Sequence, residues 1–188
     1  MTSTVTWFAG NLIAHVKLGL DIEALRAATA ELIVGQPLVH ESTKQLSLQL
    51  RKGSDNPWYE SCFKDRDIAP DVAYDTLNPV LKGTYFEEVF DTFPFPVFRA
   101  RLMALTPNHC YSVHHDQTPR LHLAIETSKH APFIFVDRNQ VFRVPADGDA
   151  YWMDTREEHT AMNGGDRLRI HLVVGLDKER FENGSSVA

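Results

Sequence analysis

Two histidines and one aspartate have the residue types and the spacing of an iron site. His114 and Asp116 are two positions apart in a segment with the pattern of a strand, so their side chains would share one face while His115 faces the other. His159 is the best placed downstream histidine to supply a third ligand. Two imidazoles and one carboxylate can bind one face of an octahedral ion and leave the opposite face open, as in non-haem Fe(II) sites. If the strand bulges, His115 would replace His114 as the ligand.

An arginine further along the chain adds a second chemical signal, which matters because an HxD tripeptide alone arises easily among nine histidines. Arg169 follows His159 by ten positions and lies inside the apolar run of residues 168–174. Burying a guanidinium is costly unless an anion meets it, and its planar fork suits a carboxylate. The sequence therefore predicts an acidic cosubstrate beside the metal.

Strands in the second half of the chain are expected to position these side chains. From Pro96 onward, short runs of β-branched and aromatic residues alternate with turn residues, which indicates an all-β sandwich or barrel of about eight strands. The predicted strands span residues 97–105, 111–115, 121–126, 133–137, 141–144, 150–154 and 168–174.

The first half of the chain is expected to form a helical layer and a loop over the site. Asp21 caps an apolar stripe that stops at Gly35, a second helix is expected over residues 84–90, and residues 46–50 alternate like a strand. Residues 53–75 are polar, aromatic and irregular, which favours a lid. We expect one domain over residues 1–188, with residues 1–95 as α/β support and lid, residues 96–176 as the β core and residues 182–188 as a frayed tail.

Composition excludes several classes of function. With 43% hydrophobic and 23% charged residues the chain has the make-up of a globular protein, and its net charge of −6 argues against binding of nucleic-acid phosphates. The two cysteines, Cys62 and Cys110, can build neither a disulfide framework nor a zinc ribbon. The charge-free stretches are too short to cross a bilayer, and no secretory signal is visible. We expect a cytoplasmic protein with neither nucleic acid nor membrane as a partner.

Several segments, taken in order, resemble the Fe(II)/2-oxoglutarate-dependent oxygenases, and within them the branch of the aspartyl/asparaginyl β-hydroxylases and bacterial proline hydroxylases. The matching segments are Arg101-Leu102-Met103-Ala104-Leu105-Thr106-Pro107-Asn108, His114-x-Asp116, Arg120-Leu121-His122-Leu123, His159 and Arg169-Ile170-His171-Leu172-Val173. The resemblance covers about residues 95–176 and implies a double-stranded β-helix, a jelly-roll of the cupin type, with helices at the N-terminal end.

The resemblance also implies roles for individual residues. His114, Asp116 and His159 would be the metal ligands at the catalytic centre, and Arg169 would bind the far carboxylate of 2-oxoglutarate. Two further residues that share a strand face, Arg120 and His122, would support the cosubstrate. Aspartyl β-hydroxylases lack the carboxylate ligand, whereas this chain offers Asp116, and this departure draws the likeness towards the proline hydroxylases.

The implied activity is hydroxylation of an unactivated C–H bond in an amino acid or a peptidyl residue. Fe(II) would be the bound metal, 2-oxoglutarate and O2 would be consumed as cosubstrates, and succinate and CO2 would be released. Two other functions stay open: a cupin-like metal enzyme that does not use 2-oxoglutarate, and a non-catalytic β-sandwich that binds a partner. Arg99 and Arg101 share a strand face, for which exposure to solvent is the preferred interpretation and recognition of a substrate carboxylate the alternative.

Overall fold

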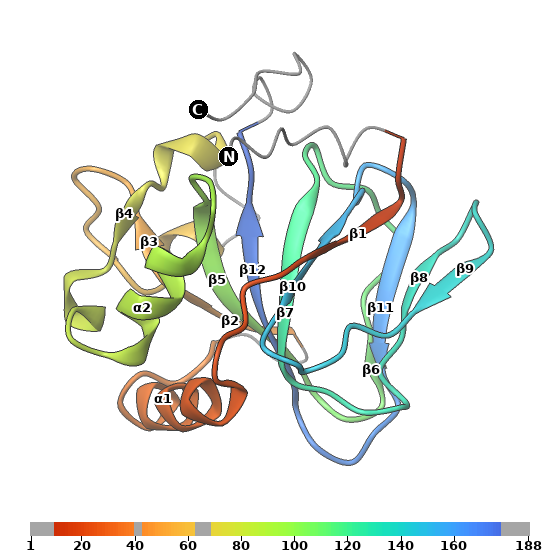
Figure 1. The fold of residues 1–188 in the computed structure, drawn as a ribbon, viewed down its shortest axis with the longest axis horizontal. Helices are drawn as coiled ribbons and strands as arrows, with labels where there is room; N and C mark the ends of the chain where they lie inside the picture. Colours follow the sequence, from red (N-terminus) through yellow and green to blue (C-terminus); the bar gives the residue numbers. More distant parts are fainter. Residues whose placement is uncertain (1–9, 40–42, 63–68, 178–188) are drawn as a thin grey trace.

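The computed structural model describes residues 10–39, 43–62 and 69–177, in which antiparallel sheets make up most of the molecule (Figure 1). The larger sheet has six strands, in the order β1 (Ile13–Val16), β10 (Ala150–Met153), β7 (Arg120–Glu126), β12 (Arg169–Gly175), β5 (Phe98–Leu105) and β2 (Thr43–Ser47). The smaller sheet has four, in the order β6 (His109–Cys110), β11 (His159–Asn163), β8 (Phe133–Phe135) and β9 (Gln140–Phe142). A separate pair joins β3 (Gln49–Leu50) to β4 (Thr76–Leu77).

Both predicted helices are confirmed. Helix α1 (Ile22–Gly35) begins at Asp21, whose carboxylate accepts hydrogen bonds from the backbone N–H groups of Glu23 and Ala24. Helix α2 (Tyr85–Thr92) begins after Thr84. Three 3-10 helices, η1 (Glu60–Cys62), η2 (Asp71–Ala73) and η3 (Pro79–Leu81), lie in the segment between β3 and α2. The helices stand beside the larger sheet, as Figure 1 shows.

Alternation along the central strands separates an apolar core from a polar interior. In β7 and β12, every second residue faces the helices and joins the main core: Leu121, Leu123, Ile125, Ile170, Leu172 and Val174. Four of the alternate residues are polar and nevertheless buried: Arg120, His122, Arg169 and His171. Because neighbouring side chains of a strand point to opposite faces, the second face of the sheet carries the polar groups. The smaller sheet covers part of this face with a second apolar cluster that includes Phe133, Phe135 and Ala161.

The predicted architecture is confirmed, since the chain is mainly β and forms the two-sheet framework of a double-stranded β-helix, with eight strands from β5 to β12. The strand expected over residues 111–115 is wrong. That segment is irregular, and it meets β11 through an isolated bridge between His114 and His159 and through hydrogen bonds of the Tyr111 backbone. The predicted lid lies partly outside the described residues, and the tail at 182–188 lies wholly outside them. Within the described ranges, no helix is both long and apolar enough to span a membrane.

Candidate active site

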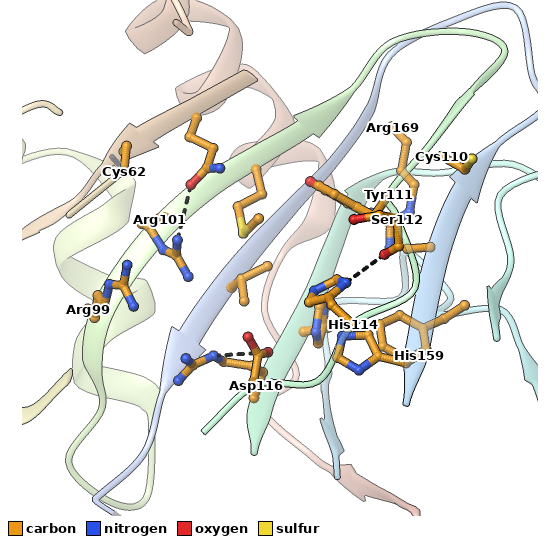
Figure 2. Close-up of a pocket in the computed structure, with 17 residues that line it drawn as sticks. Cys62, Arg99, Arg101, Cys110, Tyr111, Ser112, His114, Asp116, His159 and Arg169 are labelled. Carbon is orange, nitrogen blue, oxygen red and sulfur yellow. Dashed lines mark hydrogen bonds and ion pairs between the residues drawn. The ribbon is translucent and has the colours of Figure 1, made fainter. Parts of the chain in front are cut away.

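One cavity of about 440 Å³ brings together all six residues that the sequence singled out (Figure 2). They come from four places in the chain: the irregular segment before β7, β7 itself, β11 and β12. The six lining residues are His114, Asp116, Arg120, His122, His159 and Arg169. Residues from both sheets therefore converge on one interior space, as the resemblance implied.

His114 and His159 form the most closely defined pair in this cavity. Their backbones exchange two hydrogen bonds, with N···O distances of 3.0 Å and 2.8 Å, and their ring centroids are 4.4 Å apart. This bridge fixes the otherwise irregular HxD segment against β11. His115, between the two expected ligands, is exposed. The alternative in which a bulge exchanges His115 for His114 is not what the structure has.

Both histidines are oriented so that one ring nitrogen stays available. The Nδ1 atom of His114 lies 2.8 Å from the Ser112 carbonyl, and the Nδ1 atom of His159 lies 2.9 Å from the Glu157 carbonyl. A carbonyl accepts, so each Nδ1 carries the proton and each Nε2 keeps a free lone pair. Burial lowers the pKa of His159, which favours the neutral ring that a metal ion needs. Phe133 stacks on the His159 ring at a centroid distance of 4.9 Å.

Asp116 lines the same cavity, but its carboxylate faces an arginine. Its Oδ2 atom is 3.5 Å from Nε of Arg120, and its backbone N–H donates to the Thr155 carbonyl at 2.7 Å. Over the described ranges, no group of three or more histidine, cysteine, aspartate or glutamate side chains is assembled closely enough to hold a metal ion. The structure thus brings the two histidines together and leaves the three-ligand set a prediction.

Arg169 has the properties expected of an anchor for an anionic ligand. Its side chain is only 3% exposed, and its one hydrogen-bonded partner in the described chain is His171, whose Nδ1 atom accepts from Nη2 at 3.2 Å. The Nε atom has no partner there, and no carboxylate of these residues pairs with the guanidinium. Burial lowers the pKa of Arg169 to about 10, so the group stays charged at neutral pH. A buried, uncompensated cation of this kind is stabilised by a ligand carboxylate.

The other two predicted cosubstrate contacts differ in their state. Arg120 is already engaged, because Nη1 donates to Asp71 and to Oγ1 of Thr118. His122 is 8% exposed, and neither of its ring nitrogens has a partner in the described chain. Burial and the neighbouring Arg169 hold the pKa of His122 well below its usual value, so the ring is neutral. His122 can therefore donate to a ligand or accept from one, while Arg120 can only donate and is already paired with Asp71.

Several residues of the cavity were not expected from the sequence. The hydroxyl of Tyr111 is buried without a partner in the described chain, and Cys62 reaches the cavity from η1. The side chains of Arg99 and Arg101 also line the cavity, so the preference for a solvent-exposed face was wrong. Tyr111 could not be found from alternation, because its segment is not a strand. The sequence had named the two arginines, with recognition of a substrate carboxylate as the less preferred interpretation.

The donors present fit a divalent cation together with a dicarboxylate. Two histidine Nε2 atoms and a nearby carboxylate are suitable metal donors, and the orphaned nitrogens of Arg169 and His122 need a hydrogen-bonded partner. The cavity size lies in the lower part of the range of about 300–1,000 Å³ for small-molecule sites. The arrangement can therefore hold a metal ion with a small acidic ligand beside it.

Comparison with known proteins gives one match to a family model. The model of the aspartyl/asparaginyl β-hydroxylases matches residues 26–179. No curated protein matches the sequence.

Solved structures with a similar fold include a prolyl-4-hydroxylase from Pseudomonas putida, with 14% identity, a TM-score of 0.53 and coverage of 93% of this chain and 96% of that one. The viral collagen prolyl hydroxylase of Paramecium bursaria Chlorella virus-1, in its 2-oxoglutarate complex, has 10% identity, a TM-score of 0.51 and coverage of 89% and 98%. HygX from Streptomyces hygroscopicus, solved with nickel and 2-oxoglutarate bound, has 10% identity, a TM-score of 0.52 and coverage of 95% and 88%. At these identities the likeness establishes the fold.

Proposed function

Because this chain belongs to the aspartyl/asparaginyl β-hydroxylase family, we propose that it is an Fe(II)- and 2-oxoglutarate-dependent dioxygenase that hydroxylates an unactivated C–H bond. The observation that carries the proposal is Arg169, a buried guanidinium with no acidic partner in the described chain, in the same cavity as the His114 and His159 pair. A cation in this position would pair with a carboxylate of the cosubstrate. The two-sheet fold and its oxygenase neighbours support the same reaction class.

His114, His159 and Asp116 would hold the iron. The carbonyl partners of the two Nδ1 atoms orient both rings and leave Nε2 for the metal. Asp116 would turn its carboxylate away from Arg120 to join them, a change that leaves Arg120 paired with Asp71. When bound, the iron and 2-oxoglutarate together would supply the oxidising chemistry, in which one atom of O2 enters succinate, the other enters the substrate hydroxyl, and CO2 leaves.

Arg169 would grip the carboxylate of 2-oxoglutarate that is distant from the iron. Its Nε and Nη atoms enter the cavity from β12, and His171 fixes one edge of the guanidinium. The neutral His122 ring and the unpaired Tyr111 hydroxyl line the same space and would complete the hydrogen bonds of the cosubstrate. The substrate we propose is an amino acid or a peptidyl residue, which enters beside this bound pair.

The test of the cosubstrate site is anaerobic binding of 2-oxoglutarate in the presence of Fe(II), followed by succinate release in air. We expect the wild-type protein to bind 2-oxoglutarate and Arg169→Gln to bind it roughly 10- to 100-fold more weakly, since a charge-assisted hydrogen bond of about 1.5–3 kcal/mol is lost. Arg167→Gln is the matched control, because Arg167 is exposed and two residues away. Equal binding by Arg169→Gln and wild type would show that Arg169 is not the anchor of the cosubstrate, and absence of binding by the wild-type protein would favour the cupin-like enzyme that uses no 2-oxoglutarate.

The test of the metal site is iron retention after gel filtration. His159→Ala and Asp116→Ala should each lose the iron, because a site with two protein ligands binds Fe(II) weakly. His115→Ala, which removes an exposed imidazole from the same segment, is expected to retain it. Absence of iron from the wild-type protein under these conditions would favour the non-catalytic binding module.

A further inference from the structure

A second arginine lines the cavity without a charged partner. The guanidinium of Arg101 enters from β5, and its Nη1 atom donates to Oε1 of Gln45 at 3.0 Å. Its Nε atom is buried and has no partner in the described chain, and no carboxylate there lies within ion-pair distance. In Figure 2 the Arg101 side chain points into the cavity on the side away from Arg169. A neutral amide is a poor substitute for the hydration that this cation loses on burial.

The groups around Arg101 add positive charge and do not neutralise it, so an anion bound there would be stabilised. Arg99 lies beside it and is held by Oδ1 of Asp71 at 3.2 Å and by the Ser61 carbonyl at 2.8 Å. Burial, followed by the charges of Arg99 and Arg120, lowers the pKa of Arg101 to about 10, so it remains a cation. Cys62 does not neutralise it, because burial raises the pKa of that thiol. Asp71 is shared by Arg99 and Arg120.

Arg99 also has an uncommon backbone conformation. Its φ of 49° lies in the left-handed region, which residues other than glycine rarely adopt. Its backbone N–H donates to the Tyr74 carbonyl at 2.9 Å, which helps to hold this conformation. Strain of this kind persists where surrounding contacts fix it, and it gathers at ligand sites. Here it keeps a second positive charge next to Arg101.

Arg101 and Arg169 enter the cavity from backbone positions that are well separated along the sheet. Strands β5 and β12 pair with Arg101 opposite Val173 and with Leu105 opposite Arg169. Four residues of strand separate the two arginines, which corresponds to roughly 13 Å. Figure 2 also shows the two side chains on different sides of the cavity. A five-carbon dicarboxylate held by Arg169 therefore leaves Arg101 for a different anion.

We propose that Arg101, with Arg99 beside it, binds the carboxylate of the substrate, and that this substrate is a small free acid, an amino acid in the first place. The inference rests on the proposed function, because it takes Arg169 to be occupied by 2-oxoglutarate. A cavity of about 440 Å³ holds both the cosubstrate and a small acid. A residue within a peptide would bring amide groups to this position, and an amide leaves the charge of Arg101 uncompensated.

The experiment is calorimetric titration of the protein loaded with Mn(II) and 2-oxoglutarate. The probes are the twenty standard L-amino acids and, for each one that binds, its carboxamide. We expect at least one acid to bind and its carboxamide to bind roughly 10- to 100-fold more weakly. Arg101→Gln should weaken binding of the acid by a similar factor and leave binding of the carboxamide unchanged. The affinity of Arg101→Lys for the acid should lie between those of wild type and Arg101→Gln, because lysine keeps the charge but lacks the planar fork. Arg143→Gln, at an exposed position outside the cavity, is the control.

The affinity for 2-oxoglutarate separates the possible failures. Arg101→Gln should bind 2-oxoglutarate as tightly as the wild-type protein, which also shows that the variant is folded. The inference is overturned if acid and carboxamide bind equally, if Arg101→Gln binds the acid as the wild-type protein does, or if 2-oxoglutarate binds and no acid of the panel does. If the wild-type protein binds no 2-oxoglutarate, the proposed function fails first and the inference fails with it.

Discussion

Asp71 connects the N-terminal half of the chain to the cavity through the charges it neutralises. Its carboxylate accepts from Arg99, Arg120 and Thr118, and its side chain is 9% exposed. A buried pair that loses one partner leaves an uncompensated charge, at a cost of about 3–5 kcal/mol. We therefore expect Asp71→Asn to lower the free energy of unfolding at neutral pH by about 3 kcal/mol, measured by urea denaturation.

The pH dependence of this effect has a definite sign. Burial raises the pKa of Asp71, but Arg120, Arg99 and their hydrogen bonds outweigh it, and the pKa is lowered overall. A carboxyl whose folded pKa is depressed stabilises the protein above its unfolded pKa of about 3.9 and stops doing so as the pH falls through the folded value. The difference between wild type and Asp71→Asn should therefore be constant from about pH 7 to pH 5 and shrink below about pH 4. A difference that grows in acid would contradict the assignment.

His171 predicts a second pH effect, at milder acidity. Burial, followed by Arg169 and His122, lowers its pKa well below 6.5. The folded protein disfavours the charged ring, so His171 stabilises the fold above about pH 6.5 and this contribution is lost as the pH falls towards the folded pKa. His171→Gln keeps a polar side chain near Arg169 without the titration. Between about pH 6.5 and 5.5 its unfolding free energy should fall less steeply than that of wild type, by up to 1.4 kcal/mol per pH unit; parallel curves would contradict this.

At the scale of elements, Gly148 joins the start of β10 to the segment before α1. The backbone N–H of Leu20 donates to the Gly148 carbonyl at 3.0 Å, and a Cβ atom at Gly148 would lie 2.1 Å from the Leu20 carbonyl oxygen. Gly148 has a φ of +85° and Gly53 a φ of +79°, but a Cβ at Gly53 would meet nothing within 4 Å. Gly53→Ala should cost about 1–2 kcal/mol for the backbone conformation alone. Gly148→Ala should cost at least about 1 kcal/mol more, because the backbone must also move. Equal losses in thermal unfolding would show that the close contact is relieved without cost.

The sequence was informative where period-two alternation and caps decide the structure. Asp21 and Thr84 cap helices where expected, and β5, β7 and β12 begin within a few residues of the predicted strands. β11, which carries His159, was not predicted as a strand because it has only five residues and some of them are polar. The irregular segment around Tyr111 is held by long-range bonds to β11, and no local pattern reveals such bonds.

The sequence predicted which residues line the candidate site better than it predicted which charged groups pair with one another. An arginine in an apolar strand and an HxD followed by a distant histidine are visible as residue types, and all of them reach one cavity. The partner of a charged group is a different matter. That Asp71 binds Arg120, and that Arg169 and Arg101 lack acids, depends on how η2 packs against β5 and β7. Sequence spacing of 49 residues between Asp71 and Arg120 carries no such information.

For the whole molecule, the cavity couples the two sheets, because Arg169 lies on the larger sheet and His159 on the smaller one. A ligand that contacts both should stabilise the entire fold, by about 2.7 kcal/mol at a concentration of one hundred times its Kd. For a chain of this size that corresponds to a rise in Tm of roughly 5–10 °C.

We expect Mn(II) alone to raise Tm in both wild type and Arg169→Gln, because the histidines are intact in each. Adding 2-oxoglutarate should raise Tm further in wild type and in Arg167→Gln but not in Arg169→Gln. A cosubstrate increment that persists in Arg169→Gln would mean that 2-oxoglutarate binds elsewhere, and an increment that does not require the metal would mean that it binds without joining the two sheets at the iron.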